Sequence, residues 1–400
     1  MYNNLNIFLL ILVIGLTFSC SDTIPEQRWQ KGNLHTHSLW SDGDDFPEMI
    51  IQWYKDNNYQ FIALSDHNTI ASSQYWYKLR DREEKNNTLE KYQKQFGDWV
   101  ETKTDSNETY VRLKTFDEYK SKLESPNSFL IIKSEEVTAS FEKKPIHINV
   151  TNIQEKIEPF TGSSVLDVMQ QTLDAVHAQR TKLNVPMFAH INHPNFGYGI
   201  SINDLKKLNG ERFFEVYNGH PSVHNEGDDT HAGLEEMWDL VNVSYYRDGK
   251  PLLLGIATDD SHSYHEKSTK LSNPGRGWVM VNSEALNTTT IIDALEDGDF
   301  YATSGINLKS VFYTKRKLVV EIDSKLGVDY EIVFFGYQKG GDHVVELKRV
   351  EGKSAIYMFK KDDLFVRAKI NSNQKITNPY REGETAQAWT QPVFIKKNDW

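Results

Sequence analysis

Short apolar segments typical of buried strands alternate with helical patterns from residue 32 onward, and this order constrains the fold more than any other feature. A strand predicted over 32–37 is followed by a helix over 46–58 and a buried strand over 61–65. Strand, helix and strand within about 35 residues are typical of a parallel α/β sheet. Further strands are predicted over 128–133, 146–150, 185–193, 213–218 and 252–257, with an amphipathic helix over 165–183.

The segment Asn33-Leu-His-Thr-His-Ser-Leu-Trp-Ser-Asp-Gly43 carries the first candidate site. On an extended strand His35 and His37 leave the same face, and Asp42 follows in a Ser-Asp-Gly turn. Two imidazoles and a carboxylate that converge on one pocket are typical of a metal site. A His-x-His pair taken alone is more often solvated or satisfied in a core, so the interpretation depends on the residues that follow.

Ligand-type residues recur near the ends of the later predicted strands. Because the carboxyl ends of parallel strands are where such folds build their sites, we expect these side chains to lie close together. Nine such residues in order are hard to explain as coincidence: His35, His37, Asp42, His67, Glu136, His147, His193, Asp260 and His262.

The motifs that contain these residues resemble those of the polymerase and histidinol phosphatase (PHP) family of metal-dependent phosphoesterases. The resemblance covers about residues 31 to 305, and its stand-alone branch, which includes nucleoside bisphosphate phosphatases, fits better than the branch attached to DNA polymerases. It implies a distorted (β/α)7 barrel with a trinuclear metal centre. The matching motifs are His35-Thr-His37 with Ser41-Asp-Gly43, Ser65-Asp-His-Asn68, Glu136-Val-Thr138, His147, Asn192-His-Pro194 and Asp260-Ser-His262.

The resemblance also implies a role for each ligand. One metal would be held by His35, His37, Glu136 and Asp260, a second by Glu136, His147 and His193, and a third by Asp42, His67 and His262. Glu136 would bridge two metals, and Asp260 and His262 would also belong to the catalytic centre. A metal-bridging hydroxide would then attack the phosphorus of a small phosphorylated substrate, such as a nucleotide or a sugar or alcohol phosphate.

Mixed histidine and carboxylate ligation suits Mn, Zn or Fe better than Mg or Ca. Arg276, in Gly275-Arg-Gly-Trp278, is a candidate clamp for phosphate oxygens because a planar guanidinium matches them, and a structural salt bridge is the competing interpretation.

Three ligands have a competing neighbour in the sequence. Glu136 is preferred because it precedes Val-Thr as in the family pattern, Asp260 because Asp-x-His puts both ligands on one side, and His193 because of the His-Pro step. The competitors are Glu135, Asp259 and His190.

The metal-dependent hydrolase barrel is expected over 32–305, interrupted over 70–126 by a helical insertion that is rich in Lys, Glu, Asn and aromatic residues. Alternating strand patterns from Leu308 onward predict a C-terminal antiparallel β-sandwich-like domain over 306–400. The net charge of −11 disfavours a nucleic-acid polymer as partner and favours cation binding.

The N-terminus has the proportions of a signal peptide over 1–20, followed by a tether over 21–31. An apolar run from Ile7 to Phe18 precedes Cys20, the single cysteine, as in a bacterial lipobox, although Thr17 stands where Leu is commonest. We expect a lipid anchor on Cys20 and a place in the cell envelope, at the periplasmic or outer-membrane surface. The alternative is a cleaved secretory signal that leaves a free thiol.

Two other functions remain open at this point. An amidohydrolase-type enzyme acting on a non-phosphate bond would also use His-x-His, but it usually carries a lysine ligand, for which the sequence offers no candidate. A non-catalytic surface protein that binds a glycan or a partner would not need the full ligand set.

Overall fold

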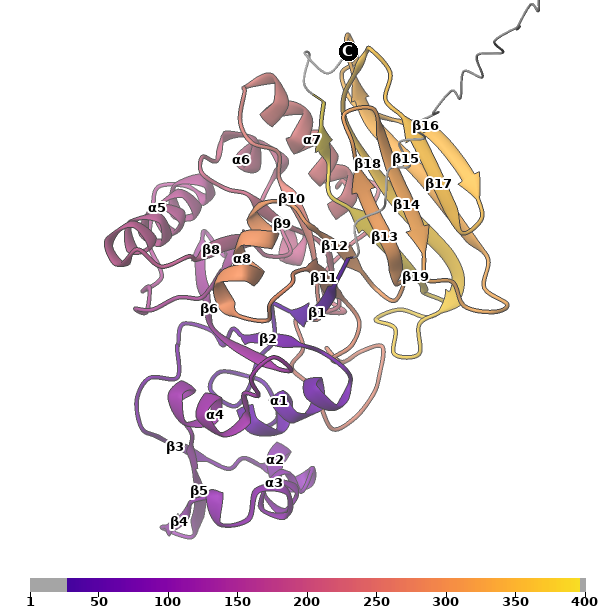
Figure 1. The fold of residues 1–400 in the computed structure, drawn as a ribbon. Coiled ribbons are helices and arrows are strands. Elements are labelled where there is room, and N and C mark those ends of the chain that lie inside the picture. The colour runs from indigo at the N-terminus through magenta and orange to yellow at the C-terminus, as the bar shows by residue number, and fades with distance from the viewer. Residues whose placement is uncertain (1–26, 396–400) are drawn as a thin grey trace, which may run out of the picture.

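The computed structural model describes residues 27–395. The predicted signal peptide, Cys20 and the first part of the predicted tether lie outside these residues. Figure 1 shows a mixed α/β part beside a C-terminal part built from strands, with a 14-stranded sheet running through both. The prediction of a mixed α/β protein is therefore confirmed. Within residues 27–395, no helix is long and apolar enough to cross a membrane.

Seven strands of the α/β part are ordered β10-β9-β8-β7-β6-β2-β1. β1, β2 and β6 run parallel, as do β8, β9 and β10, whereas β7 is antiparallel to both of its neighbours. Thr36, after β1, pairs with Ser261, after β10, so the two edges of this seven-stranded sheet meet. The strands are β1 (Trp29–Asn33), β2 (Phe61–Leu64), β6 (Leu130–Phe141), β7 (Lys144–Thr151), β8 (Phe188–Ile191), β9 (Phe213–Asn218) and β10 (Leu254–Thr258).

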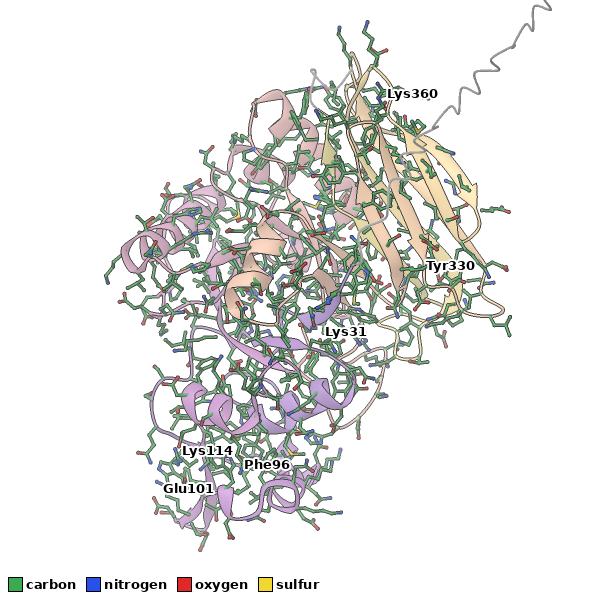
Figure 2. All side chains as sticks on the ribbon, viewed as in Figure 1. Lys31, Phe96, Glu101, Lys114, Tyr330 and Lys360 are labelled. Atoms are coloured by element: carbon green, nitrogen blue, oxygen red, sulfur yellow. The ribbon has the colours of Figure 1, made fainter. Side chains whose placement is uncertain are left out.

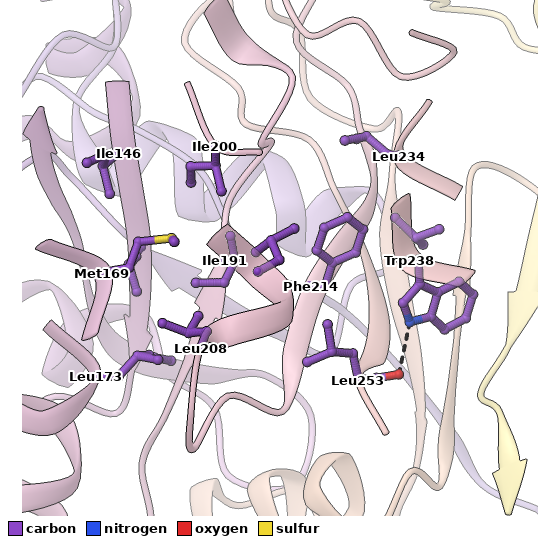
Figure 3. Close-up of a cluster of buried hydrophobic side chains, with 14 of the residues drawn as sticks. Ile146, Met169, Leu173, Ile191, Ile200, Leu208, Phe214, Leu234, Trp238 and Leu253 are labelled. Carbon is purple, nitrogen blue, oxygen red and sulfur yellow. Dashed lines mark hydrogen bonds between the residues drawn. The ribbon is translucent and has the colours of Figure 1, made fainter. Parts of the chain in front are cut away.

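Helices cover the outside of these strands because their apolar faces pack on nearly continuous apolar strands. Figure 3 shows Ile191 of β8 and Phe214 of β9 packed between Met169 of α5 and Trp238 of α7, and the Trp238 indole donates to Leu253 O at 2.9 Å. Each such fully buried side chain contributes about 1.5–3 kcal/mol. The helices are α1 (Pro47–Asp56), α5 (Val165–Leu183), α6 (Ile202–Lys207), α7 (Leu234–Arg247) and α8 (Thr288–Glu296), and a 3-10 turn, η2 (Phe196–Tyr198), follows β8.

Residues 70–126 contain strands as well as helices, so the prediction of a purely helical insertion is wrong. Aromatic and β-branched residues such as Tyr110 and Val111 favour a strand, and Ser106 and Asn107 turn the chain with φ of 51° and 66°. The strands β3 (Tyr75–Lys78), β5 (Glu108–Leu113) and β4 (Thr102–Asp105) form one antiparallel sheet in that order. The helices are α2 (Asp81–Lys85), α3 (Thr88–Phe96) and α4 (Phe116–Leu123), with a 3-10 turn, η1 (Gly97–Trp99).

The insertion lies at the opposite end of the molecule from the C-terminal part. Figure 2 labels Glu101 and Lys114, whose Nζ donates to Glu101 Oε1 at 2.6 Å, far from Tyr330 in the C-terminal sheet. Arg82 Nη2 donates to Gly43 O at 2.6 Å. The insertion therefore contacts the turn that carries Asp42.

The C-terminal part continues the large sheet by antiparallel pairing in the order β1-β11-β12-β19-β18-β15-β16, and β20 pairs with β18. A second sheet, β13-β14-β17, shares a core with it through Leu318 and Val320 on one side and Phe334 and Val366 on the other. The strands are β11 (Trp278–Asn282), β12 (Phe300–Thr303), β13 (Leu308–Tyr313), β14 (Lys317–Ile322), β15 (Tyr330–Gln338), β16 (Val344–Glu351), β17 (Ser354–Met358), β18 (Asp363–Lys375), β19 (Thr385–Thr390) and β20 (Val393–Phe394).

The loop between β18 and β19, residues 376–384, reaches back to the α/β part. Asn378 Nδ2 donates to Pro274 O at 3.1 Å, and the Tyr380 hydroxyl donates to Glu226 Oε1 at 2.8 Å. Glu384 Oε1 accepts the hydroxyl of Tyr217 at 2.7 Å. This loop therefore contacts β9 itself and the segments that follow β9 and β10.

Candidate metal centre

His35 and His37 follow β1 rather than lie on it, which corrects the prediction of one strand over 32–37. Asn33 Oδ1 accepts the N–H of His35 at 2.8 Å, and this local hydrogen bond ends the strand. The segment then pairs with the residues after β10, where His37 N–H donates to Ser261 O and Asp260 N–H donates to His35 O, both at 3.0 Å. Asp260 has a φ of 49°, an uncommon backbone conformation that this pairing holds.

Four side-chain atoms converge at a fully buried position. His35 Nε2 lies 3.2 Å from Asp260 Oδ1 and 3.4 Å from Glu136 Oε2. His37 Nε2 lies 3.2 Å from each of the same two oxygens. Four ligands about 2.0–2.1 Å from one tetrahedral ion would stand roughly 3.3 Å apart, so these separations fit a single metal ion.

The same group contains buried polar atoms that make no hydrogen bond. They are Nε2 of His35, Nε2 of His37 and Oε2 of Glu136. Buried polar atoms are nearly always satisfied, and a bound cation would satisfy all three. These atoms are buried, make no hydrogen bond and are of the types that bind metals, so they indicate a metal site.

Glu136 also faces a second group of imidazoles. Its Oε1 lies 3.0 Å from His147 Nδ1 and 3.6 Å from His193 Nε2, and its Oε2 lies 2.9 Å from His67 Nδ1. Glu136 sits within β6, which continues to Phe141 instead of ending at Lys133 and forms a hairpin with β7. A carboxylate with a different imidazole set on each oxygen can bridge two metals.

Asp42 gathers a third group at the more exposed side. Its Oδ1 lies 3.3 Å from His262 Nε2, and its Oδ2 lies 3.6 Å from His67 Nε2. His262 Nδ1 lies 2.9 Å from Asp260 O and donates to it, because a carbonyl only accepts. Nε2 of His262 is then the free ligand atom, in the tautomer that a metal needs.

The structure thus brings all nine predicted ligands together in one cluster. Of the competing neighbours, Glu135 accepts the N–H of Ile157 at 3.0 Å, away from the cluster. Asp259 accepts the N–H groups of Gly275 and Gly277 at 2.9 and 2.8 Å. His190 Nε2 approaches Glu215 Oε1 at 3.5 Å instead of Glu136.

The buried charges shift the titration of the cluster. Burial lowers the pKa of His35, but the charges of Asp260 and Glu136 outweigh it and raise the pKa well above the usual value. Burial raises the pKa of Glu136, but the surrounding imidazoles outweigh it and hold the pKa well below the usual range. Without a bound metal, protons on the imidazoles therefore balance the negative charge of the carboxylates.

Metal affinity should consequently fall as the pH falls. An imidazole must lose its proton to bind a metal, and the raised pKa of His35, His37, His67 and His193 lets protons compete from a higher pH than usual. We expect the apparent Kd for Mn²⁺ to rise by up to about tenfold per pH unit for each proton released, measured by calorimetry between pH 8 and pH 6. A pH-independent Kd would contradict this coupling.

Glu215 contacts two of the candidate ligands, although the sequence does not single it out as a site residue. Its Oε1 accepts from His35 Nδ1 at 2.7 Å and from the Thr258 hydroxyl at 2.8 Å, and its Oε2 accepts the His193 N–H at 2.8 Å. A carboxylate on Nδ1 fixes the tautomer and orientation of a ligating imidazole. A charged residue inside the otherwise apolar run of β9 is the signal that could have identified it.

Glu215→Gln should weaken metal binding while leaving the nine ligands in place. Loss of an orienting carboxylate typically costs about 10–100-fold in metal affinity. Competition against a chelator of known affinity measures this effect, and circular dichroism checks that the variant is folded. An unchanged affinity would mean that Glu215 serves packing alone.

The prediction that Arg276 clamps phosphate oxygens is wrong, because its guanidinium is already bound to backbone carbonyls. The side chain is fully buried, and its Nη1 donates to Gly219 O at 2.8 Å and Leu271 O at 2.7 Å. Its Nε donates to Asn378 O at 3.0 Å and its Nη2 to Ser268 O at 2.9 Å. The guanidinium is committed to backbone carbonyls of three loops, a use that the local sequence does not reveal.

A cleft of about 1170 Å³ lies away from this cluster, and none of the nine candidate ligands lines it. It is bordered by Leu252 and Leu254 at the start of β10, and by Phe312 and Phe359 of the C-terminal part. The ligand cluster and this cleft therefore belong to opposite ends of β10.

No family model and no curated protein matches the sequence. Over 93% of its length the chain resembles 96% of a two-domain protein from Bacteroides vulgatus that contains a predicted PHP-like metal-dependent phosphoesterase, with 15% identity and a TM-score of 0.43. Over 60% it resembles 91% of a provisionally assigned metal-dependent phosphoesterase from Bifidobacterium adolescentis, with 11% identity and a TM-score of 0.34. An amidohydrolase from Chromobacterium violaceum matches 58% of the chain over 87% of its own length, with 15% identity and a TM-score of 0.29.

These three similarities are distant, and the ligand cluster itself is the stronger indication of function. The first of these neighbours contains a predicted PHP-like metal-dependent phosphoesterase, and the second is provisionally assigned as a metal-dependent phosphoesterase.

Proposed function

We propose that this protein is a metal-dependent phosphoesterase that hydrolyses a small phosphorylated substrate. The observation that carries the proposal is the convergence of His35 Nε2 and His37 Nε2 on Glu136 Oε2 and Asp260 Oδ1, at distances of 3.2–3.4 Å. Neither of these two Nε2 atoms makes a hydrogen bond. Two further histidine and carboxylate groups adjoin this convergence. A binding protein or a structural core does not need such a set.

The residues divide among three proposed metal positions. The buried position would use His35, His37, Glu136 and Asp260, the second Glu136, His147 and His193, and the third Asp42, His67 and His262. The donor set suits Mn, Zn or Fe. When bound, such metals would supply an activated water and neutralise the charge of the phosphoryl oxygens.

The exposure of the ligands indicates the side from which a substrate would approach. The side chains of His35 and His37 are fully buried, whereas those of His262, His67 and Asp42 are 19%, 23% and 55% exposed. A phosphate group would therefore enter past Asp42 and His262. The buried imidazoles would stay shielded from water at the closed end.

The protein's own residues would hold this arrangement during turnover. Glu215 keeps the tautomer of His35, and the carbonyl of Asp260 keeps that of His262. We further propose that the meeting of the two sheet edges through Thr36 and Ser261 closes a distorted seven-stranded barrel, with the cluster at the carboxyl ends of its parallel strands.

We also propose that Cys20 carries a lipid that anchors the protein at the cell envelope. The support is the apolar run from Ile7 to Phe18 directly before this single cysteine. Metabolic labelling with a palmitate analogue in a bacterial host tests the proposal, with Cys20→Ala as the control. Equal labelling of the two proteins would refute it.

The function is tested by elemental analysis of the mature protein together with hydrolysis of p-nitrophenyl phosphate and bis(p-nitrophenyl) phosphate, with and without added manganese. We expect two to three metals per chain and turnover that His35→Ala abolishes. The ratio of the two rates separates monoester from diester preference. Bound metal without hydrolysis of either ester would refute the proposed reaction, and absence of metal would refute the site.

A further inference from the structure

His220 lies beside the exposed side of the cluster but belongs to none of the metal-binding groups. It sits in the loop between β9 and α7, and its ring centroid is 5.6 Å from that of His262 and 6.1 Å from that of Phe196. Phe196 in turn packs edge-on against His193 at 5.3 Å. His220 therefore lies beside His262 directly and beside His193 through Phe196, and these two ligands belong to different proposed metal positions.

The hydrogen bond at Nδ1 fixes the tautomer of His220. The backbone N–H of Ser222 donates to Nδ1 at 3.1 Å, and a backbone N–H can only donate. Nδ1 must then be unprotonated, so the proton of the neutral ring is on Nε2. Among residues 27–395, no hydrogen bond is recorded for this Nε2–H group, which is thus a donor without a protein acceptor.

The backbone of His220 is tied to the ligands by one side chain. Asn218 Oδ1 accepts the His220 N–H at 2.8 Å. Asn218 Nδ2 donates to Glu215 Oε2 at 2.9 Å and to Asp260 Oδ2 at 3.2 Å. The position of His220 is therefore set by the same hydrogen bonds that orient the ligands, which is the arrangement expected of a group that acts with them.

The ion pairs of the cluster join its own histidines and carboxylates. In the described part of the chain, the recorded ion pairs of the nine ligands join them only to one another and to Glu215, and none involves a lysine or arginine. The guanidinium of Arg276 is consumed by backbone carbonyls. A phosphoryl oxygen that projects away from the metals needs a donor from the loops.

We propose that His220 binds the substrate, donating its Nε2–H to a phosphoryl oxygen at the entrance of the cluster. This inference rests on the proposed phosphoesterase function, and it adds a substrate contact that is not a metal ligand. A neutral donor suits a position beside imidazoles and metals, since it adds no positive charge that would repel them.

The experiment compares the manganese-loaded full-length protein with His220→Ala, His220→Gln and His231→Ala. Calorimetry measures the Kd of inorganic phosphate, and elemental analysis measures metal content. We expect His220→Ala to weaken phosphate binding by about 10–100-fold with unchanged metal content, as for a lost hydrogen bond to a charged group. His220→Gln should recover part of the affinity because its amide N–H can replace Nε2–H.

His231→Ala is the matched control in the same loop. Its ring stacks on Tyr198 at 3.7 Å and pairs with Asp228 at 2.8 Å, so phosphate binding should not change. Equal phosphate affinity of wild type and His220→Ala, or loss of metal in His220→Ala, overturns the inference, and so does a wild type that binds no phosphate. If wild type binds phosphate but hydrolyses no ester, the proposed function fails, while the His220→Ala comparison still decides the role of this residue.

Discussion

Glu136→Gln should lose most of its bound metal and about 10³-fold or more of its hydrolytic rate. Glu136 contacts imidazoles assigned to all three proposed metal positions, among them His35, His67 and His147. Glutamine has nearly the same shape but no charge, so the variant removes the charge that would hold adjacent cations together. The measurement is metal content together with kcat for p-nitrophenyl phosphate.

Glu135→Gln is the matched control for that experiment. Glu135 precedes Glu136 in the same strand and is equally buried, but it faces the N–H of Ile157. Burial raises the pKa of Glu135 to about 7, so replacement by a neutral amide should cost little below that pH. Equal losses in both variants would show that any change in β6 disrupts the site, and the role of Glu136 as a bridge would then fall.

Arg276→Ala should lower the stability of the folded protein by about 3–5 kcal/mol. The truncation would take the guanidinium donors away from the backbone carbonyls of Gly219, Leu271 and Asn378. A urea titration followed by fluorescence measures the change. Turnover should fall as well, since the loop after β10 would lose its brace.

Arg381→Ala provides the comparison for a surface charge. Its guanidinium pairs with Glu226 at 2.8 Å, and about half of the side chain is exposed, so we expect a change below about 1 kcal/mol. If Arg276→Ala keeps full stability and only raises KM for the phosphate ester, Arg276 is a phosphate clamp after all, and the structural role argued for it is wrong.

Most of the candidate ligands could be selected from the sequence because short local motifs mark them, whereas His147 stands alone in its strand. His35-Thr-His37, Asn192-His-Pro194 and Asp260-Ser-His262 are local patterns, and the apolar strand before each one indicates where it lies in the fold. The mixed α/β class follows from the same alternation. The sequence was sufficient where two candidate ligands stand close together in the chain, as in His35-Thr-His37 and Asp260-Ser-His262.

The remaining features depend on contacts between distant segments. Glu215 reaches His35 across 180 residues, and Arg276 reaches Asn378 across 102. Nothing beside Arg276 distinguishes a guanidinium that binds carbonyls from one that binds phosphate. The strands of the insertion were missed because β3 pairs with β5 across two intervening helices, so no continuous strand pattern marks them.

The loop over residues 376–384 has a consequence for how this protein can be altered. Through Asn378, Tyr380 and Glu384 it contacts Arg276, Glu226 and Tyr217 of the α/β part. The C-terminal part is thus tied to the segments that follow β9 and β10, and the segment after β10 carries Asp260 and His262 of the candidate metal centre. A shortened chain ending near residue 305 would lose these contacts. We therefore expect the α/β part, expressed alone, to hold the loops around the candidate metal centre less firmly than the whole protein does.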